Sequence, residues 1–270
     1  MSLGRLRTDR AIRTLSTMGD GQRSGSGARA SGERDEHAFR IAGADMRPHS
    51  RGPIVGITVN LEDDQYRCRN EYALAVRRAG AVPILLPAVT ESIPHYLELC
   101  EAFVTTGGDD PDTTMFGMTP HPKATLMDPV RQEFELELLE SMKSTRHPLL
   151  AICLGMQLFS LAHGGVLEQH LPDVLESAEE HWGGRLHPVS GCLGEGMVHS
   201  HHKQVMSSAG NLDIIARSHD DLIEAVRAPD APHRIGVQWH PERTEEHGFG
   251  QGLFNALVES TNLVRNENRT

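Results

Sequence analysis

Short apolar runs of strand length alternate with amphipathic segments along the chain after residue 53. The apolar runs are typical of strands buried in a parallel sheet, and the segments between them place apolar residues at helical spacing. The predicted strands are 54–59, 83–87 and 102–106, and the predicted helices are 71–80 and 93–100. This order predicts an α/β fold with a mostly parallel sheet, helices on both faces and a functional site beyond the carboxyl ends of the strands.

A further strand leads directly into a helix at Cys153. The apolar run 148–152 is followed by helical spacing at 156–162. In a nucleophile elbow such a turn lifts the nucleophile above the sheet, and the small residues Ala151 and Gly155 would let strand and helix approach. The helix amino terminus would favour a thiolate and could stabilise an oxyanion. The alternative interpretation of Cys153 is an inert cysteine buried in the core.

The motif His240-Pro241-Glu242 ends another predicted strand, at 234–239. Because residues two apart in an extended segment point the same way, the imidazole and the carboxylate can lie on one side. Glu242 could then accept a hydrogen bond from one imidazole nitrogen and leave the other to face Cys153. The predicted catalytic residues are therefore Cys153, His240 and Glu242.

Charge divides the chain into two parts. The whole chain of 270 residues carries a formal net charge of −11. Residues 1–52 hold ten Arg, no Lys and six acids, a net charge of +4, which leaves −15 on the remainder. We expect 1–52 to be a disordered basic tail and 53–270 to be one catalytic domain, with organelle targeting or an upstream start as the alternatives for the tail. The acidic domain argues against nucleic acid as a partner.

Cysteine usage and hydropathy indicate the compartment. The four cysteines, at 68, 100, 153 and 192, match no metal or disulfide spacing, so reduced thiols are expected. No apolar run approaches the roughly eighteen residues that a membrane span requires. We therefore expect a cytoplasmic protein without a membrane partner.

Three segments resemble the motifs of class I glutamine amidotransferases. They are Ala-Ile-Cys-Leu-Gly-Met-Gln at 151–157, Gly-Val-Gln-Trp-His-Pro-Glu at 236–242 and Gly-Gly-Asp-Asp-Pro-Asp at 107–112. Within that group the chain most resembles the gamma-glutamyl-gamma-aminobutyrate hydrolase type of peptidase, on the segments 128–135, 164–171, 198–204 and 221–225. The likeness spans about residues 53–262 and implies the flavodoxin-like fold of that family.

The resemblance also implies a mechanism on a small gamma-glutamyl amide. Cys153 would attack the side-chain carbonyl to form a thioester, His240 would protonate the leaving amine, and water would release glutamate. The family's oxyanion hole maps onto backbone N–H groups at Gly108 and Leu154. Its contacts to the glutamyl group map onto Gln157, Ser200 and His201 by resemblance. No cofactor and no metal are expected.

Two departures from the hydrolase pattern keep a second function open. Leu154 stands where the hydrolases commonly have arginine, and it resembles the amidotransferases that feed ammonia to a synthase. Ala151 replaces the usual glycine, a change that the elbow should tolerate. The alternative to a free-standing hydrolase is therefore a glutaminase subunit with a synthase partner, and a homodimer is the other assembly considered. A binding module without turnover is the third alternative.

Several polar residues allow more than one interpretation. The loop 109–128 should cover the substrate, with Asp109 and Asp110 either binding its amino group or capping a turn. The group His199, His201 and His202 fits a pocket rim, a solvated surface or a metal site, and the last is weakened because no carboxylate or cysteine follows at ligand spacing. His181 and His187 are interpreted as packing or surface residues, and Glu133 as a residue that supports the fold.

Overall fold

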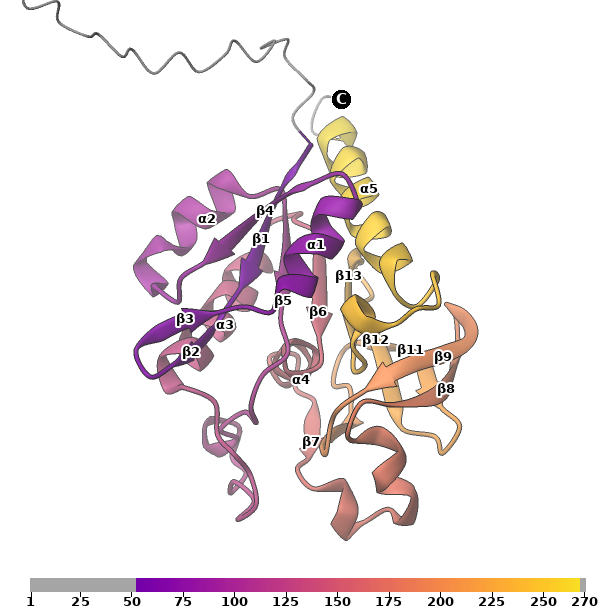
Figure 1. Ribbon diagram of the computed structural model, residues 1–270. Coiled ribbons are helices and arrows are strands. Elements are labelled where there is room, and N and C mark those ends of the chain that lie inside the picture. Colours follow the sequence, from indigo (N-terminus) through magenta and orange to yellow (C-terminus); the bar gives the residue numbers. More distant parts are fainter. Residues whose placement is uncertain (1–51, 268–270) are drawn as a thin grey trace, which may run out of the picture. The chain divides into compact units, whose positions relative to one another are not determined.

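The computed structural model describes residues 52–267, and its centre is a parallel sheet (Figure 1). Five strands run parallel in the order β4-β1-β5-β6-β13. The tail predicted for residues 1–52 lies, apart from residue 52, outside the described residues. The parallel strands are β1 (Ile54–Thr58), β4 (Val82–Leu86), β5 (Ala102–Thr105), β6 (Leu149–Ile152) and β13 (Ala231–Val237).

An antiparallel extension continues the sheet beyond β13 (Figure 1). The path continues β12-β11-β8-β9, and β10 pairs with both β12 and β7 to complete eleven strands. A separate pair, β2 (Asn60–Glu62) and β3 (Gln65–Arg67), forms a small hairpin. The extension consists of β7 (Val166–Glu168), β8 (Arg185–Gly191), β9 (Gly194–Ser200), β10 (Val205–Ser208), β11 (Asp213–Ser218) and β12 (Ile223–Ala228).

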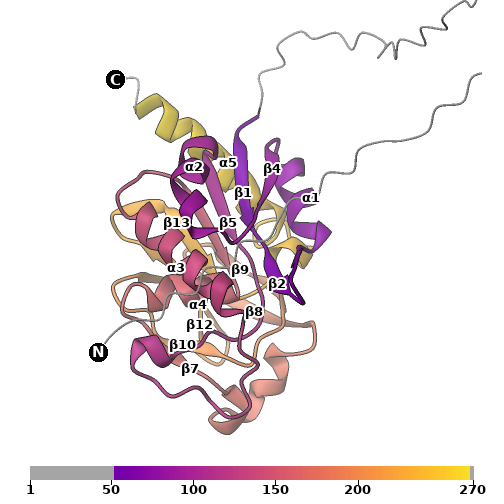
Figure 2. The ribbon, with the colours of Figure 1, turned by 90° about the vertical axis from the view of Figure 1, so that its left-hand side faces the viewer.

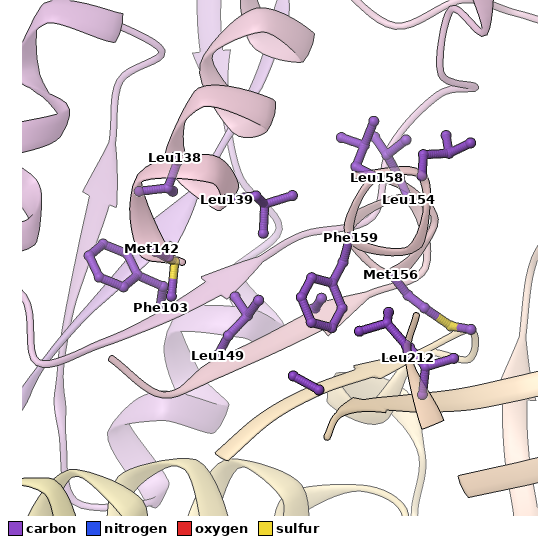
Figure 3. Close-up of a cluster of buried hydrophobic side chains, with 14 of the residues drawn as sticks. Phe103, Leu138, Leu139, Met142, Leu149, Leu154, Met156, Leu158, Phe159 and Leu212 are labelled. Carbon is purple, nitrogen blue, oxygen red and sulfur yellow. The ribbon is translucent and has the colours of Figure 1, made fainter. Parts of the chain in front are cut away.

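Helices cover both faces of the parallel strands, as Figures 1 and 2 show. Side chains alternate along each strand, so that Leu149 and Ala151 of β6 join one core while Leu150 and Ile152 join the other. The first core packs against α2 (Ile93–Leu99), α3 (Pro129–Met142) and α4 (Leu154–Leu161), and Figure 3 shows its centre. The second packs against α1 (Asn70–Arg78) and α5 (Gln251–Glu267).

The sequence-based prediction of a mostly parallel α/β fold is confirmed. The first three predicted strands each match an observed strand to within a residue or two, and the structure adds the antiparallel strands between 185 and 228, which the sequence analysis did not assign. The loop 109–128 contains one short 3-10 helix, η2 (Thr114–Phe116), and a β-bridge between Asp110 and Leu126. Within residues 52–267, every helix is too short or too polar to cross a membrane.

The β6–α4 junction is a tight turn with close helix–strand packing. Cys153 takes φ 52° and ψ −108°, a conformation that costs a non-glycine residue on the order of 1–3 kcal/mol. Its N–H donates to the Val237 carbonyl at 2.8 Å, which fixes the turn to the neighbouring strand. Two residues on, a Cβ atom on Gly155 would lie 2.4 Å from Thr105 Oγ1 and 2.6 Å from the Thr105 carbonyl oxygen. Helix α4 can therefore approach β5 only with glycine at 155.

Replacing Gly155 by alanine tests this close approach. Because backbone of β5 cannot move aside without breaking the sheet, we expect G155A to lower the free energy of unfolding by about 1–3 kcal/mol in urea denaturation. The matched control is G248A, where an added Cβ meets nothing within 4 Å; we expect a change within about 0.5 kcal/mol. Equal effects of the two substitutions would contradict the packing argument.

Candidate active site

Cys153 lies where three parallel strands end. Strand β6 is paired with β5 on one side and β13 on the other, with Ala151 opposite both Thr105 and Gly236. The segments that leave these strands, Gly107–108 and His240, therefore meet Cys153 at one edge of the sheet. The Cys153 side chain is 6 % exposed, and it lines two cavities. It is thus buried but open to small molecules, unlike the inert core cysteine of the alternative interpretation.

His240 and Glu242 form a hydrogen-bonded pair beside this sulfur. His240 Nδ1 lies 2.8 Å from Glu242 Oε1, in a turn that begins the 3-10 helix η5 (Pro241–Arg243). The backbone of His240 is held in turn, because its N–H donates to the His199 carbonyl at 2.9 Å and its carbonyl accepts from Thr244 Oγ1 at 2.9 Å. Two hydrogen bonds and one ion pair therefore orient the imidazole.

Electrostatics make this imidazole unusually basic. Burial opposes its charge, but the Cys153 sulfur and the Glu242 carboxylate outweigh burial and raise the pKa of His240 to about 9. Burial likewise opposes the Glu242 charge, yet the hydrogen bond and charge of His240 lower the pKa of that carboxyl. An imidazolium that contacts both groups can stabilise a thiolate and later deliver a proton to a leaving group.

The turn after β5 supplies the backbone next to the sulfur. The Gly107 N–H donates to Tyr72 Oη at 3.1 Å, so this amide already has a partner. A Cβ atom on Gly107 would lie 3.0 Å from His240 Cε1, and one on Gly108 would lie 2.9 Å from Leu154 Cδ2. The two positions predicted as an oxyanion hole, Gly108 and Leu154, are therefore adjacent in space. Leu154 opens α4, where amides have no intrahelical acceptor.

A buried arginine on α3 hydrogen-bonds to the backbone of the turn after β5. Arg131 is fully buried on α3 and donates to the Thr106 carbonyl at 3.1 Å and the Gly107 carbonyl at 3.2 Å. Its charge is compensated by Glu135, at 2.7 Å between Nε and Oε1. Glu133 on the same helix, interpreted from the sequence as a residue that supports the fold, is exposed and lines neither cavity beside Cys153. The i,i+4 spacing of Arg131 and Glu135 within α3 was the available signal.

The predicted substrate residues divide into two groups. Gln157 is buried, lines the smaller cavity and donates from Nε2 to Gln238 Oε1 at 3.3 Å. His201 lines both cavities, and its ring stacks on Trp182 with 4.1 Å between centroids. Ser200 contradicts the prediction, because it is fully buried and its hydroxyl donates to the His181 carbonyl at 3.0 Å.

Gln238 was missed by the sequence analysis. It is fully buried, and its Nε2 lies 3.6 Å from Cys153 Sγ. Its signal was its place two residues before His240 in a strand that leads into the site. Together with Gln157 it forms an amide pair that connects the sulfur with the wall of the smaller cavity.

Two cavities flank Cys153. The larger, of about 440 Å³, is lined by His240, Tyr72 and three arginines. The smaller, of about 180 Å³, is lined by Gln157, Lys203 and Gln204. Residues shared by both are Gly108, Asp109, Cys153 and His201.

The loop aspartates have different surroundings. The Asp110 carboxylate accepts the Thr125 N–H at 2.8 Å, and its backbone N–H donates to the Thr125 carbonyl at 2.8 Å. Asp110 therefore joins the two arms of the loop 109–128, in agreement with the turn-capping interpretation. Asp110 also lines the smaller cavity, whereas Asp109 lines both cavities and can contact a substrate in either.

The histidines of 199–202 do not gather at one point. His199 lies beside His240, with ring centroids 6.2 Å apart, and His201 faces the cavities. His202 is buried and turns toward Glu224. Two sets of side chains among the described residues could hold a metal ion: His181, His187, His202 and Glu224, and also His121, His170 and Asp173.

Comparisons with known proteins agree with this geometry. The model of the Peptidase C26 family matches residues 53–242. The chain belongs to the peptidase C26 family. A Mycobacterium tuberculosis protein provisionally named a glutamine amidotransferase is 33% identical over 77% of this chain and 74% of its own length. The gamma-glutamyl-gamma-aminobutyrate hydrolase of Escherichia coli K12 is 28% identical over 76% and 92%.

Solved structures place the same fold among glutamine amidotransferases. A glutamine amidotransferase from Thermotoga maritima superimposes on this protein with a TM-score of 0.54 at 14% sequence identity. The superposition covers 78% of the present chain and 98% of the Thermotoga chain. At this identity the likeness supports the fold, and the family match adds that the chain is a member of a glutamine amidotransferase-like hydrolase family.

The raised pKa of His240 predicts how stability depends on pH in this C26 family member. The folded-state pKa of about 9 exceeds the ordinary histidine value of about 6.5. The imidazolium therefore stabilises the fold fully below about pH 6.5, and that contribution is lost as pH rises through about 9. We expect the difference in unfolding free energy between wild type and H240Q to shrink over this range in urea denaturation. A difference that stays constant over this pH range would refute the charged pair.

Proposed function

We propose that this protein hydrolyses gamma-glutamyl amides of small molecules through a thioester on Cys153. The observation that carries the proposal is that Cys153 lines two cavities, of which only the larger is also lined by His240. A hydrolase of this kind needs one space for the acyl group and another for the leaving amine. The family match and the hydrolase relatives support the same chemistry.

In this proposal, the position of His240 decides which cavity holds the leaving amine and which holds the glutamyl group. The leaving nitrogen must take its proton from the imidazole, and His240 lines the larger cavity. The leaving amine therefore occupies the larger cavity of about 440 Å³, and the glutamyl group occupies the smaller one of about 180 Å³. Asp109 is then placed to accept from the alpha-amino group of the glutamyl moiety, and the Gln157 amide is placed to donate to its alpha-carboxylate.

The proposed reaction proceeds in two steps. The Cys153 thiolate attacks the amide carbon, the oxyanion is stabilised by the backbone N–H groups of Gly108 and Leu154, and the amine leaves with a proton from His240. A water molecule then enters the vacated larger cavity, gives a proton to His240 and attacks the thioester. Glutamate leaves, and the thiolate–imidazolium pair is restored.

The charged residues that line the larger cavity indicate what charge the leaving amine carries. Arg67, Arg69 and Arg243 line it, against the two acids Glu62 and Asp109. Arg67 is paired with Glu62, and Arg243 lies 3.5 Å from Glu242. Arg69 is exposed at the start of α1 and faces the cavity. We therefore infer that the leaving amine carries an anionic group such as a carboxylate.

The glutaminase alternative has one observation behind it. Relatives from Mycobacterium tuberculosis and Lactococcus lactis carry provisional amidotransferase names. Leu154, which favoured this alternative in the sequence, is 1 % exposed and packs beneath the turn at Gly108, so its side chain gives no group to a substrate. Ammonia as a leaving group would need no cavity of about 440 Å³, which favours the hydrolase.

Glutamate release tests the proposed function directly. We expect the purified protein to release glutamate from gamma-glutamyl derivatives of amino acids and amines, faster than from glutamine. C153A should reduce release to the background rate, because it removes the sulfur beside the His240–Glu242 pair. The matched control is C192A, which removes an exposed cysteine that lines neither cavity. If no substrate releases glutamate until a synthase is added, the glutaminase alternative is favoured. If C153A is as active as the wild type, the thioester mechanism on Cys153 is excluded.

Removing the charge of Arg69 tests whether the larger cavity binds an anionic leaving amine. We expect R69Q to raise KM about five-fold for a gamma-glutamyl amine that bears a carboxylate, because an exposed ion pair contributes up to about 1 kcal/mol. KM for an uncharged amine of the same length should stay unchanged. R78Q, at the exposed end of α1, is the control for charge alone. An equal change in KM for both substrates would show that Arg69 does not face the leaving amine.

A further inference from the structure

Three histidines converge on one buried carboxylate away from the Cys153 sulfur. His181 Nδ1, His187 Nε2 and His202 Nε2 each lie 3.6 Å from Glu224 Oε1. The four ligand atoms lie within 4.8 Å of one another. All four side chains are at most 3 % exposed. The residues come from the 3-10 helix η4 (Glu176–His181), from β8, from the turn after β9 and from β12.

The outer nitrogens of these rings have hydrogen-bond acceptors. His202 Nδ1 lies 2.8 Å from the Gln204 carbonyl, and His187 Nδ1 lies 3.3 Å from the Pro188 carbonyl. A carbonyl oxygen only accepts, so both Nδ1 atoms carry a proton and both Nε2 atoms are turned toward Glu224. His181 is held the same way, with Nε2 at 3.0 Å from the Asp220 carboxylate.

The inner atoms, by contrast, have no hydrogen-bond partner among the described residues. This holds for the three inner nitrogens and for both oxygens of Glu224. A buried carboxylate without a hydrogen-bond partner is strongly unfavourable unless a cation neutralises it. Protonated imidazoles would close on the carboxylate to about 2.7–2.9 Å, and the observed separation is 3.6 Å.

The separation fits a metal ion instead. Zinc binds histidine nitrogen and carboxylate oxygen at about 2.0–2.2 Å, which places the ligands of a tetrahedron roughly 3.3–3.6 Å apart. Metal-bound histidines typically donate their second N–H to a carbonyl or carboxylate, as these three do. The other candidate set differs, because Asp173 already lies at 3.1 Å from His121 and 3.0 Å from His170, which are ordinary hydrogen-bond distances.

We propose that His181, His187, His202 and Glu224 form a structural site for one divalent transition-metal ion, of which zinc fits best. Four protein ligands leave no open position for substrate, so the ion holds the fold together and takes no part in chemistry. The sequence analysis expected no metal, because the ligands are spread over 44 positions (181–224) and follow no short spacing.

The site would act on the candidate active site through two neighbours of its ligands. Trp182 and His201, whose rings stack at 4.1 Å, directly follow His181 and precede His202. Both line the smaller cavity. Glu224 also accepts the Gln238 N–H on its carbonyl at 2.8 Å. The ion would thus fix the wall of this cavity without contacting Cys153.

Metal analysis of the tag-free full-length protein tests the proposal, and its outcome does not depend on the proposed enzymatic function. We expect about one zinc ion per chain after purification without chelators. X-ray absorption at the zinc edge should show only nitrogen and oxygen ligands at about 2.0 Å. The protein reconstituted with cobalt should show the intense visible bands of tetrahedral Co²⁺. Less than about 0.1 ion per chain, both as purified and after zinc addition and desalting, would overturn the site.

Single-ligand variants locate the ion. We expect E224Q and H187Q to lose zinc by at least about ten-fold in affinity, while H95Q, which removes an exposed histidine on α2, keeps it. H121Q removes a histidine from the other set and should also keep the ion. Sulfur ligands in the absorption spectrum, or full zinc content in E224Q and H187Q, would overturn the assignment. If these variants do not fold, the wild-type spectrum and the H121Q metal content decide the question.

Discussion

The contact between Gly155 and the backbone of Thr105 is the constraint on which the rest of the candidate active site depends. It lets α4 begin directly after β6, and the backbone of Cys153 is forced into a positive φ. The strain is compensated by the hydrogen bond from Cys153 N–H to the Val237 carbonyl and by the packing of α4 in the first core. A larger residue at 155 would move the sulfur away from both neighbouring strands. The nucleophile position is therefore a property of helix–strand packing.

The parallel pairing of β6 with its two neighbouring strands brings the other residues of the candidate active site to the turn at Cys153. Since β5, β6 and β13 end in register, the chain leaving β5 brings Gly107–108 to one side of Cys153, and the chain leaving β13 brings His240 to the other. Each neighbour is secured by its own polar contacts, the first by Arg131 and Tyr72 and the second by Glu242 and Thr244. Cys153 lines two cavities of unequal size, only the larger of which is lined by His240, and this asymmetry supports the proposed division between acyl group and leaving amine.

Buried charged side chains lie in both halves of the protein, beside the parallel strands and within the antiparallel ones. In the parallel half, the Arg131 guanidinium is matched by Glu135 and by the backbone carbonyls after β5. In the antiparallel half, Glu224 faces three imidazoles without a hydrogen bond to any of them. The first arrangement is electrostatically complete within the protein, and the second becomes complete with a cation. The same physical cost of burying charge thus explains one site and motivates the metal proposal for the other.

The sequence by itself determined the parallel half of the fold and the elbow. Apolar runs and helical spacing are local, so the order of elements, the turn at Cys153 and the His-Pro-Glu end of a strand could be predicted from neighbouring residues. Local patterns could not show which way Ser200 points, because one residue decides whether a side chain of β9 faces a cavity or the interior. Tertiary structure alone brought Gln238 to the sulfur and Arg131 beneath the glycine turn. It also gathered His181, His187, His202 and Glu224, since strand pairing joins residues that no sequence spacing connects.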